Sequence, residues 1–314
     1  MNRSVLIADD MHLSIIPMLE KEGFTPDYQP QISRQELLNV IGNYQGLFIR
    51  SKTKIDVEVL NNAKQLAFIG RAGAGLDLID IEAARERNIH VFAANEGNRD
   101  AVAEHVIGMI LCLFNKINTA DREVRQRIWL REANRGIELK GMTVGIIGFG
   151  NMGQALSERL RGFGVQVLAY DKYKQGFGND FVQEVSLEEL LEKADVISFH
   201  VPLSAETRMW VNDAFLNQCK KEIFLINSSR GEIASVKSIL TGLQTGKLRG
   251  ACLDVLENEK MATLTPEQEA TYEALFQLNN VILSPHVAGW TVESYLKINE
   301  VLIEKLVAQY ATQA

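Results

Sequence analysis

Residues 143–153 read TVGIIGFGNMG, an apolar run that leads into a turn with three glycines. Gly148, Gly150 and Gly153 form the pattern G-x-G-x-x-G, and a helical pattern follows them. In a strand–turn–helix of this kind the first glycine permits the tight turn and the second lets a pyrophosphate approach the backbone. The third lets the helix pack closely on the strand. Because free N–H groups and the helix dipole attract anions, the pattern predicts a phosphate loop for a dinucleotide.

A carboxylate follows the next apolar run. Val165–Tyr170 is typical of a strand and leads into Asp171, 18 residues beyond Gly153. A carboxylate there accepts hydrogen bonds from adenosine ribose hydroxyls and repels a 2′-phosphate, which favours NAD over NADP. The neighbouring Lys172 weakens that preference. The alternative is a glycine turn without a ligand, but the complete context favours an NAD cofactor.

Outward from this turn, short apolar runs alternate with amphipathic stretches. The runs that predict strands are Val5–Ala8, Gly46–Ile49, Leu66–Gly70, Ile89–Ala93, Thr143–Gly148, Val165–Tyr170, Val196–Phe199, Ile223–Asn227, Leu248–Leu253 and Val281–Ser284. The stretches that predict helices include Arg34–Ile41, Gln154–Phe163, Leu187–Lys193, Ser235–Thr245, a long helix over 99–127 and a last helix over 292–311. Alternating units with near-continuously apolar strands predict an α/β fold with doubly wound parallel sheets. The series restarts near Lys140, and at roughly 150 residues per domain the length of 314 residues favours two domains.

Composition and charge argue against several classes of function. The net charge is −7 and no block of Lys and Arg occurs, so we expect no nucleic-acid partner. The longest apolar run, 106–114, is about half of the roughly 18 residues that span a bilayer, so we expect no membrane partner. The three cysteines lie far apart in apolar segments, which predicts free thiols and no metal site. Two acidic residues near the N-terminus come before any apolar signal-peptide core could form, so we expect no export signal. A cytoplasmic location is therefore expected.

Candidate chemistry follows three later strands. His286 lies in LSPHVAG, just past the carboxyl end of a strand, where open α/β sheets place ligands. Arg230 in NSSRG and the acids of residues 253–259 follow two other strands, and they could clamp a carboxylate and orient an imidazole. Each alone is more simply a structural residue or a surface ion pair, but together they favour a hydride-transfer site. Among the other histidines, His105 is expected to pack in its apolar segment and His200 to line the cofactor cleft.

Several separated motifs occur together in this chain. They are Arg71–Asp77 (RAGAGLD), Ala101–His105 (AVAEH), Gly145–Gly153, Asn227–Gly231, Leu253–Val255 with Glu259, and Ser284–His286. Over nearly its whole length the sequence resembles the D-isomer-specific 2-hydroxyacid dehydrogenases, particularly short members similar to 3-phosphoglycerate dehydrogenase.

The resemblance implies how the chain is organised. A Rossmann NAD-binding domain, residues 99–286, would be inserted in a flavodoxin-like substrate-binding domain, residues 1–98 and 287–314. The cleft between such domains would close over the substrate and exclude water. Members of the family are usually homodimers joined through their nucleotide domains. The apolar helix 101–114 and Trp129 could supply that surface, although core packing is an equally simple interpretation.

The resemblance also implies a role for Arg230, Glu259 and His286. His286 would protonate the substrate carbonyl oxygen as NADH delivers hydride, and would take the proton back in the reverse direction. Glu259 would hydrogen-bond the imidazole and stabilise its charged form, and Arg230 would bind the α-keto acid. The backbone N–H groups of Ala74 and Gly75 would hold the carboxylate from the other side. The glycines themselves favour such an anion nest, although a plain turn is their simpler interpretation.

The remaining implied contacts are with cofactor and substrate. Contacts with NAD are implied for Gly148, Phe149, Gly150, Asn151, Met152, Gly153, Asp171, His200, Val201, Pro202, Thr207, Ser228, Ser229, Arg230, Asp254, His286 and Gly289. Contacts with a small 2-keto or 2-hydroxy acid are implied for Arg50, Ser51, Ala74, Gly75, Arg230 and His286.

Some loops depart from the family pattern. Lys260 stands where the family often has proline after the catalytic glutamate, and the segment from Glu259 to His286 is slightly long. Residues 96–98 read Glu-Gly-Asn where the family often has Pro-Gly-x-Asn. These differences bear on loop shape and substrate choice and leave the three catalytic residue types in place.

We therefore expect an NAD-dependent oxidoreductase for a D-2-hydroxy acid, with 3-phosphoglycerate and phosphohydroxypyruvate as the first substrate pair. Cations that could meet a phosphate, each more simply a solvated charge, are Arg50, Lys52, Lys54 and Arg99. Glyoxylate, hydroxypyruvate or another 2-keto acid is the alternative, and Trp290 could wall the pocket or belong to the core. An alternative of another class is a non-enzymatic NAD-sensing protein, against which the intact catalytic residue types argue. Formate dehydrogenase is disfavoured because that branch carries Gln at the position of Glu259.

Overall fold

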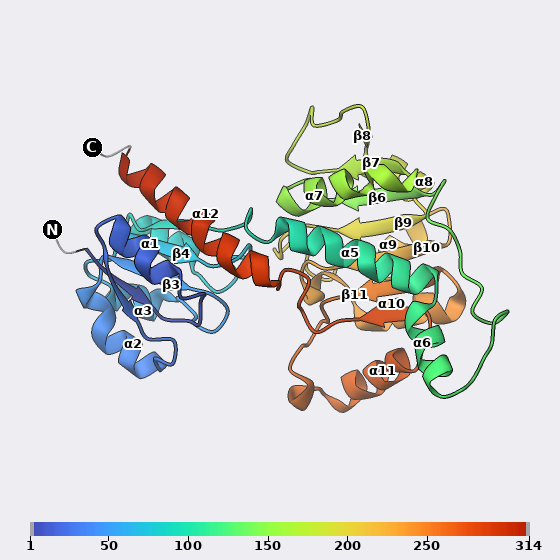
Figure 1. The fold of residues 1–314 in the computed structure, drawn as a ribbon, viewed down its shortest axis with the longest axis horizontal. Helices are drawn as coiled ribbons and strands as arrows, with labels where there is room; N and C mark the ends of the chain where they lie inside the picture. The colour runs from blue at the N-terminus through green and yellow to red at the C-terminus, as the bar shows by residue number, and fades with distance from the viewer. Residues whose placement is uncertain (1–2, 312–314) are drawn as a thin grey trace. The chain divides into compact units, whose positions relative to one another are not determined.

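The computed structural model describes residues 3–311, which form two compact units with one parallel sheet each. The first unit comprises the described residues up to Arg99 and from Trp290 onward, and the second comprises Asp100–Gly289. In Figure 1 the first unit carries the blue and cyan segments and the red helix α12 (Val292–Ala311). The expected α/β class with two parallel sheets is confirmed.

The first unit has a five-stranded sheet in the order β2-β1-β3-β4-β5, the flavodoxin-like arrangement. Its strands are β1 (Ser4–Ile7), β2 (Thr25–Tyr28), β3 (Gly46–Ile49), β4 (Phe68–Arg71) and β5 (His90–Ala93). Leu6 and Leu47 pack in the core on one face, while Val5 and Phe48 pack on the other. Alternate side chains of the central strands are therefore buried on opposite faces, as a doubly covered sheet requires.

The described residues of the first unit form five short helices besides α12. They are α1 (Ile15–Lys21), α2 (Arg34–Val40), the 3-10 helix η1 (Ile41–Asn43), α3 (Val57–Asn62) and α4 (Ile81–Glu86). Three of them, α2, α3 and α4, begin at polar side-chain caps. Ser33, Asp56 and Asp80 each accept a backbone N–H three residues on, which satisfies an otherwise orphaned donor. Helix α12 adds Leu302 and Leu306 to the core that contains β1. The last helix of the chain is therefore part of the first unit (Figure 1).

The second unit has a seven-stranded sheet in the order β12-β11-β10-β9-β6-β7-β8, a Rossmann order with one further strand. Its strands are β6 (Thr143–Ile147), β7 (Gln166–Tyr170), β8 (Val182–Glu184), β9 (Val196–Phe199), β10 (Ile223–Asn227), β11 (Leu248–Leu253) and β12 (Val281–Leu283). Its helices are α5 (Arg99–Phe114), α6 (Ile117–Arg125), α7 (Asn151–Leu160), η2 (Arg161–Phe163), α8 (Leu187–Lys193), α9 (Asp213–Gln218), η3 (Gly231–Ile233), α10 (Val236–Thr245), η4 (Met261–Thr263) and α11 (Pro266–Phe276).

The register of this sheet brings particular loops together. Asn227, Leu253 and Leu283 pair across β10, β11 and β12 as the last residues of their strands. The segments that follow these three strands therefore leave the same edge of the sheet side by side. Ile147 of β6 likewise pairs with the last residue of β7 and of β9, which places the phosphate-loop turn between Asp171 and His200.

Two local expectations are wrong. The long helix expected over 99–127 is two helices, α5 and α6, because the backbone at Lys116 is left-handed with φ 51°. The short strands β2 and β8 were not expected from the sequence. Both lie at an edge of their sheet, and β2 contains Pro26, which an edge strand tolerates.

Candidate active site

Glycine is required at the three positions of the phosphate loop for different structural reasons. Gly148 has φ 92°, and a Cβ there would lie 2.5 Å from the carbonyl oxygen of His200. A Cβ at Gly153 would overlap the carbonyl oxygen of Gly148. Gly150 precedes the first residue of α7, and a Cβ there would meet no protein atom within 4 Å. Gly148 and Gly153 are needed because a side chain at either position would clash with the backbone. Gly150 instead leaves open space before a helix N-terminus, which fits a bound pyrophosphate.

Asp171 is held beside this loop. Its Oδ2 accepts the N–H of Phe149 at 2.9 Å, and its Oδ1 accepts the N–H groups of Tyr173 and Lys174 at 2.9 and 3.1 Å. A pocket of about 540 Å³ lies here. Its lining comprises Tyr170, Asp171, Lys172, Lys174, Gln175, Glu184, Val185, Ser186 and Glu189. The Asp171 carboxylate thus lines open space beside the phosphate loop, and its contact with an adenosine ribose stays a prediction.

Replacing Asp171 with asparagine is expected to weaken NADH binding about tenfold and to reduce discrimination against NADPH. The amide oxygen can keep part of the backbone hydrogen bonding, but the charge that repels a 2′-phosphate is lost. Fluorescence titration with both cofactors measures the two dissociation constants. Asp180→Asn, at an exposed residue paired with Arg161, is the matched control. An unchanged NADH/NADPH ratio in Asp171→Asn would contradict the ribose assignment.

The segment after β9 contains His200, Val201, Pro202 and Thr207. His200 donates its backbone N–H to Ile147 at 2.8 Å, and its Nε2 lies 2.8 Å from Ser198 Oγ. The Thr207 hydroxyl donates to the Pro202 carbonyl at 2.7 Å, which closes the turn. His200 and Val201 therefore adjoin Gly148 of the phosphate loop. The contacts of all four residues with NAD remain a prediction.

Desolvation lowers the pKa of His200 to about 4. The unfolded chain therefore binds this proton at a higher pH than the folded chain does, because an unfolded histidine titrates near about 6.5. The neutral, buried His200 therefore adds to the free energy of unfolding. This addition is complete above pH ~6.5 and is lost as the pH falls toward ~4, by up to about 1.4 kcal/mol per pH unit. Urea unfolding at several pH values measures it. His200→Gln should show a shallower decline over this interval, and an unchanged slope would show that His200 does not titrate in this way.

Arg230 is placed by a turn that Asn227 builds. The Asn227 Oδ1 accepts from the N–H and hydroxyl of Ser229, and its Nδ2 donates to the Arg230 carbonyl at 3.0 Å. The Ser228 hydroxyl oxygen is buried without a hydrogen-bond partner among the described residues. Such an orphaned buried group fits a ligand atom there, in agreement with the expected cofactor contact. A Cβ at Gly231 would overlap the Leu256 carbonyl oxygen, so glycine lets this turn pack against the loop after β11.

His286 and Glu259 form a direct pair. The Nδ1 of His286 lies 3.0 Å from Oε2 of Glu259, although 27 positions separate the two residues. Both side chains are 46% exposed, so the imidazole is accessible to a small molecule. Because Nδ1 faces the carboxylate, it carries a proton and Nε2 is the ring nitrogen that can exchange a proton with a substrate. The structure thus joins the expected acid to the expected histidine and places Arg230 on the adjacent loop.

Asp254 is buried at the base of the His286 turn. Its carboxylate accepts the N–H groups of Val287 and Ala288, both at 2.9 Å, and the hydroxyl of Ser284 at 2.6 Å. The ring Nε2 of His105 lies 2.9 Å from that same hydroxyl. We expected Asp254 to contact the cofactor, which stays a prediction. The links to Ser284 and His105 differ from the expectation that His105 packs in its apolar segment.

The expected substrate residues of the first unit follow β3 and β4. Ser51 is exposed, whereas Ala74 and Gly75 are partly buried next to Gly73, which has φ 130°. Asp9 is buried, and its Oδ2 accepts the backbone N–H groups of residues 50, 52 and 53, which fixes the loop after β3.

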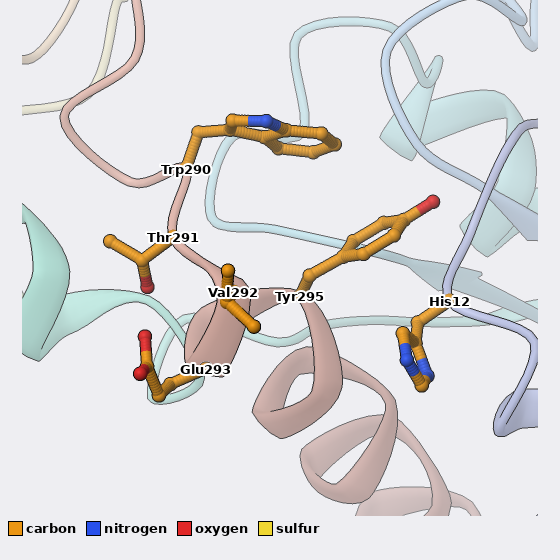
Figure 2. Close-up of a pocket in the computed structure, with 6 residues that line it drawn as sticks. All are labelled: His12, Trp290, Thr291, Val292, Glu293 and Tyr295. Atoms are coloured by element: carbon orange, nitrogen blue, oxygen red, sulfur yellow. The ribbon is translucent and has the colours of Figure 1, made fainter.

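Arg50 stacks on an aromatic ring. Its guanidinium carbon lies 3.5 Å from the centre of the Trp290 ring, and its Nη1 is 3.9 Å from Asp10 Oδ2. Burial lowers the pKa of Arg50. Trp290, 45% exposed, lines a pocket of about 550 Å³ in the first unit (Figure 2). The residues around this pocket are His12, Trp290, Thr291, Val292, Glu293 and Tyr295.

Two negative findings apply to residues 3–311. No group of three or more potential metal ligands occurs among them. No helix in this range is long and apolar enough to cross a bilayer.

Comparisons with known proteins identify the family of this chain. The family model described as the NAD binding domain of D-isomer specific 2-hydroxyacid dehydrogenases matches residues 107–288. The D-3-phosphoglycerate dehydrogenase of Archaeoglobus fulgidus is 35% identical over 305 residues, 96% of this chain and 56% of that protein. The glyoxylate reductase of Thermofilum pendens is 35% identical over 289 residues, 90% of this chain and 82% of that protein. The crystal structure of the PH0520 protein from Pyrococcus horikoshii OT3 has a TM-score of 0.82 and 29% identity, and the match covers 98% of this chain and 92% of that one.

The Rossmann order and the glycine-rich turn before α7 define the class of dinucleotide-binding domains. Within that class, this chain belongs to the D-isomer specific 2-hydroxyacid dehydrogenase family. It spans about half the length of the D-3-phosphoglycerate dehydrogenases that it matches.

Proposed function

We propose that the chain interconverts a D-2-hydroxy acid and its 2-keto acid with NAD, and that 3-phosphoglycerate and phosphohydroxypyruvate are the substrate pair. The observation that carries the proposal is the Glu259–His286 pair at the sheet edge that also carries the phosphate loop. A carboxylate-oriented imidazole at the same sheet edge as a dinucleotide site is what a proton-coupled hydride transfer needs. The D-3-phosphoglycerate dehydrogenase relatives support the choice of substrate.

The mechanism assigns one task to each residue. When bound, NADH supplies a hydride to the carbonyl carbon of the keto acid. His286 gives a proton from Nε2 to the carbonyl oxygen and accepts it back in the oxidation direction, while Glu259 holds Nδ1 and so fixes the ring. Arg230 binds the carboxylate and polarises the carbonyl with its planar donors. For the first unit we propose, from the family resemblance, that Arg50, Ser51 and the backbone N–H groups of Ala74 and Gly75 contact the carboxylate of the acid.

A second substrate class is favoured by a specific observation. Arg50 is stacked on Trp290, and Lys52 Nζ donates to the carbonyl oxygens of residues 30 and 32, so both cations already have partners within the first unit. This favours an unphosphorylated acid such as glyoxylate or hydroxypyruvate. The glyoxylate reductase relative, of which the chain covers 82%, supports the same alternative.

An NADH-oxidation panel tests the function. The assay follows the loss of NADH absorbance at 340 nm and gives kcat/KM for each substrate. The substrates are phosphohydroxypyruvate, hydroxypyruvate, glyoxylate, pyruvate and a branched 2-keto acid. We expect turnover of at least one, with the highest kcat/KM for phosphohydroxypyruvate. A preference for glyoxylate or hydroxypyruvate would select the second class. No turnover of any of them, with intact NADH binding, would favour an NAD-sensing protein and contradict the enzymatic proposal.

We infer that the chain forms a homodimer through the arm that follows α6, residues 126–142. No residue of α6 is buried, and the arm exposes Ile128, Trp129 and Leu130, with Trp129 80% exposed. An exposed tryptophan between apolar neighbours is typical of an interface anchor. Sedimentation analysis should find a dimer, and Trp129→Ser should weaken it at least about tenfold. Trp290→Ser, at a tryptophan that is 45% exposed and lies in the first unit, is the control. A monomeric wild-type chain would contradict the inference.

A cytoplasmic location is proposed from the cysteines. Cys112, Cys219 and Cys252 are free thiols, and burial raises the pKa of Cys219 to about 11, which keeps it as an unreactive thiol. Free cysteines fit a reducing compartment. Cell fractionation with compartment markers tests this location.

A further inference from the structure

A network of three polar side chains connects helix α5 to the turn that carries His286. His105 Nε2 lies 2.9 Å from Ser284 Oγ, and Ser284 Oγ lies 2.6 Å from Asp254 Oδ1. A serine hydroxyl has one proton, and the carboxylate can only accept. Ser284 therefore donates to Asp254 and must accept from His105. The direction of the network requires a proton on His105 Nε2, whether the ring is neutral or charged.

The other end of the network is the backbone around His286. The Asp254 carboxylate, on a residue only 2% exposed, accepts the N–H groups of Val287 and Ala288, and the Asp254 carbonyl accepts the N–H of His286 at 2.7 Å. His286 itself is left-handed with φ 54°. A non-glycine residue adopts this conformation only where its surroundings hold it there. Asp254 provides three of the bonds that hold this turn.

We propose that His105 and Ser284 are positioning residues for His286. They fix the Asp254 carboxylate, and Asp254 in turn fixes the left-handed turn from which the imidazole reaches Glu259. This inference rests on the proposed acid–base role of His286. Neither residue touches a reacting atom in this account. Their contribution is geometric, because a displacement of about 1 Å in a catalytic group can cost up to about 100-fold in rate.

Three single variants and one double variant test the network. His105→Leu removes the donor, Ser284→Ala removes the linking hydroxyl, and His105→Gln keeps an N–H that can donate. We expect His105→Leu and Ser284→Ala each to lower kcat about tenfold, with KM and NADH affinity within about twofold. Because both residues act through Asp254, the double variant His105→Leu/Ser284→Ala should also lose about tenfold in kcat. His105→Gln should recover most of the wild-type kcat.

Hydrogen exchange gives a measurement that does not depend on activity. The amides of Val287 and Ala288 should exchange about tenfold faster in His105→Leu and Ser284→Ala than in the wild type. His90→Leu, at an exposed position of β5, is the control for loss of a histidine. If the wild type reduces no 2-keto acid, the proposed function fails and hydrogen exchange alone still decides whether the network holds the turn.

Several results would overturn the proposal. One is a wild-type kcat or a wild-type rate of amide exchange in Ser284→Ala. This variant makes the smallest change, and the test depends on it if His105→Leu does not fold. A double variant that loses about 100-fold would show independent effects. A His105→Gln variant as impaired as His105→Leu would show that the hydrogen-bond donor is not what matters.

Discussion

Replacing His286 with alanine is expected to lower kcat by about 10²- to 10⁴-fold while NADH still binds. The imidazole is the group that carries a proton next to the proposed carbonyl, and Glu259 cannot reach across the missing ring. The phosphate loop and Asp171 lie after other strands, so cofactor affinity should remain within a few-fold of the wild type. Steady-state NADH oxidation and fluorescence titration separate the two effects.

Two further variants make this test specific. Glu259→Gln keeps an oxygen that can accept from Nδ1 but removes the charge, so we expect a smaller loss than for His286→Ala, of about tenfold. His90→Ala removes an exposed histidine of β5 and should leave kcat unchanged. Wild-type turnover by His286→Ala would remove the acid–base role of this residue.

Replacing Gly150 with alanine is expected to weaken NADH binding about 10- to 100-fold without lowering the thermal stability of the protein alone. A Cβ at this position meets no protein atom within 4 Å, and the backbone has φ −83°, which any residue can adopt. The added methyl group therefore disturbs only a ligand that approaches the start of α7. Calorimetric titration with NADH and thermal unfolding give the two quantities.

Two other glycines provide the comparison for Gly150. Gly162→Ala, where a Cβ also meets no atom within 4 Å, should change neither NADH binding nor stability. Gly153→Ala should lower the melting temperature, because its Cβ would overlap the carbonyl oxygen of Gly148. Wild-type NADH affinity in Gly150→Ala would mean that the pyrophosphate does not approach this glycine.

The features that could be predicted from the sequence are those encoded over short distances. The strand β6, the glycine turn and helix α7 are contiguous, so one motif specifies all three. Parallel strands place their carboxyl ends at one edge, which is why loops after β10, β11 and β12 could be expected to meet. The pairing of Glu259 with His286 follows from that rule and from the family resemblance.

The features that could not be predicted depend on distant contacts. His105 meets Ser284 across 179 positions, and nothing near His105 in the sequence distinguishes a packing histidine from one that donates to a serine. The stacking of Arg50 on Trp290 is equally non-local. The helix break at Lys116 arises from one left-handed residue in a stretch that otherwise has a helical pattern.

We propose that this chain uses NADH and the Glu259–His286 pair to form a D-2-hydroxy acid. The most direct measurement is the chirality and yield of the hydroxy acid formed when purified wild-type protein reduces phosphohydroxypyruvate with NADH, analysed by chiral chromatography. We predict the D-isomer alone, one molecule for each NADH oxidised, and no detectable product from His286→Ala. The L-isomer, a racemic product, or D-product formed equally well by His286→Ala would contradict the account.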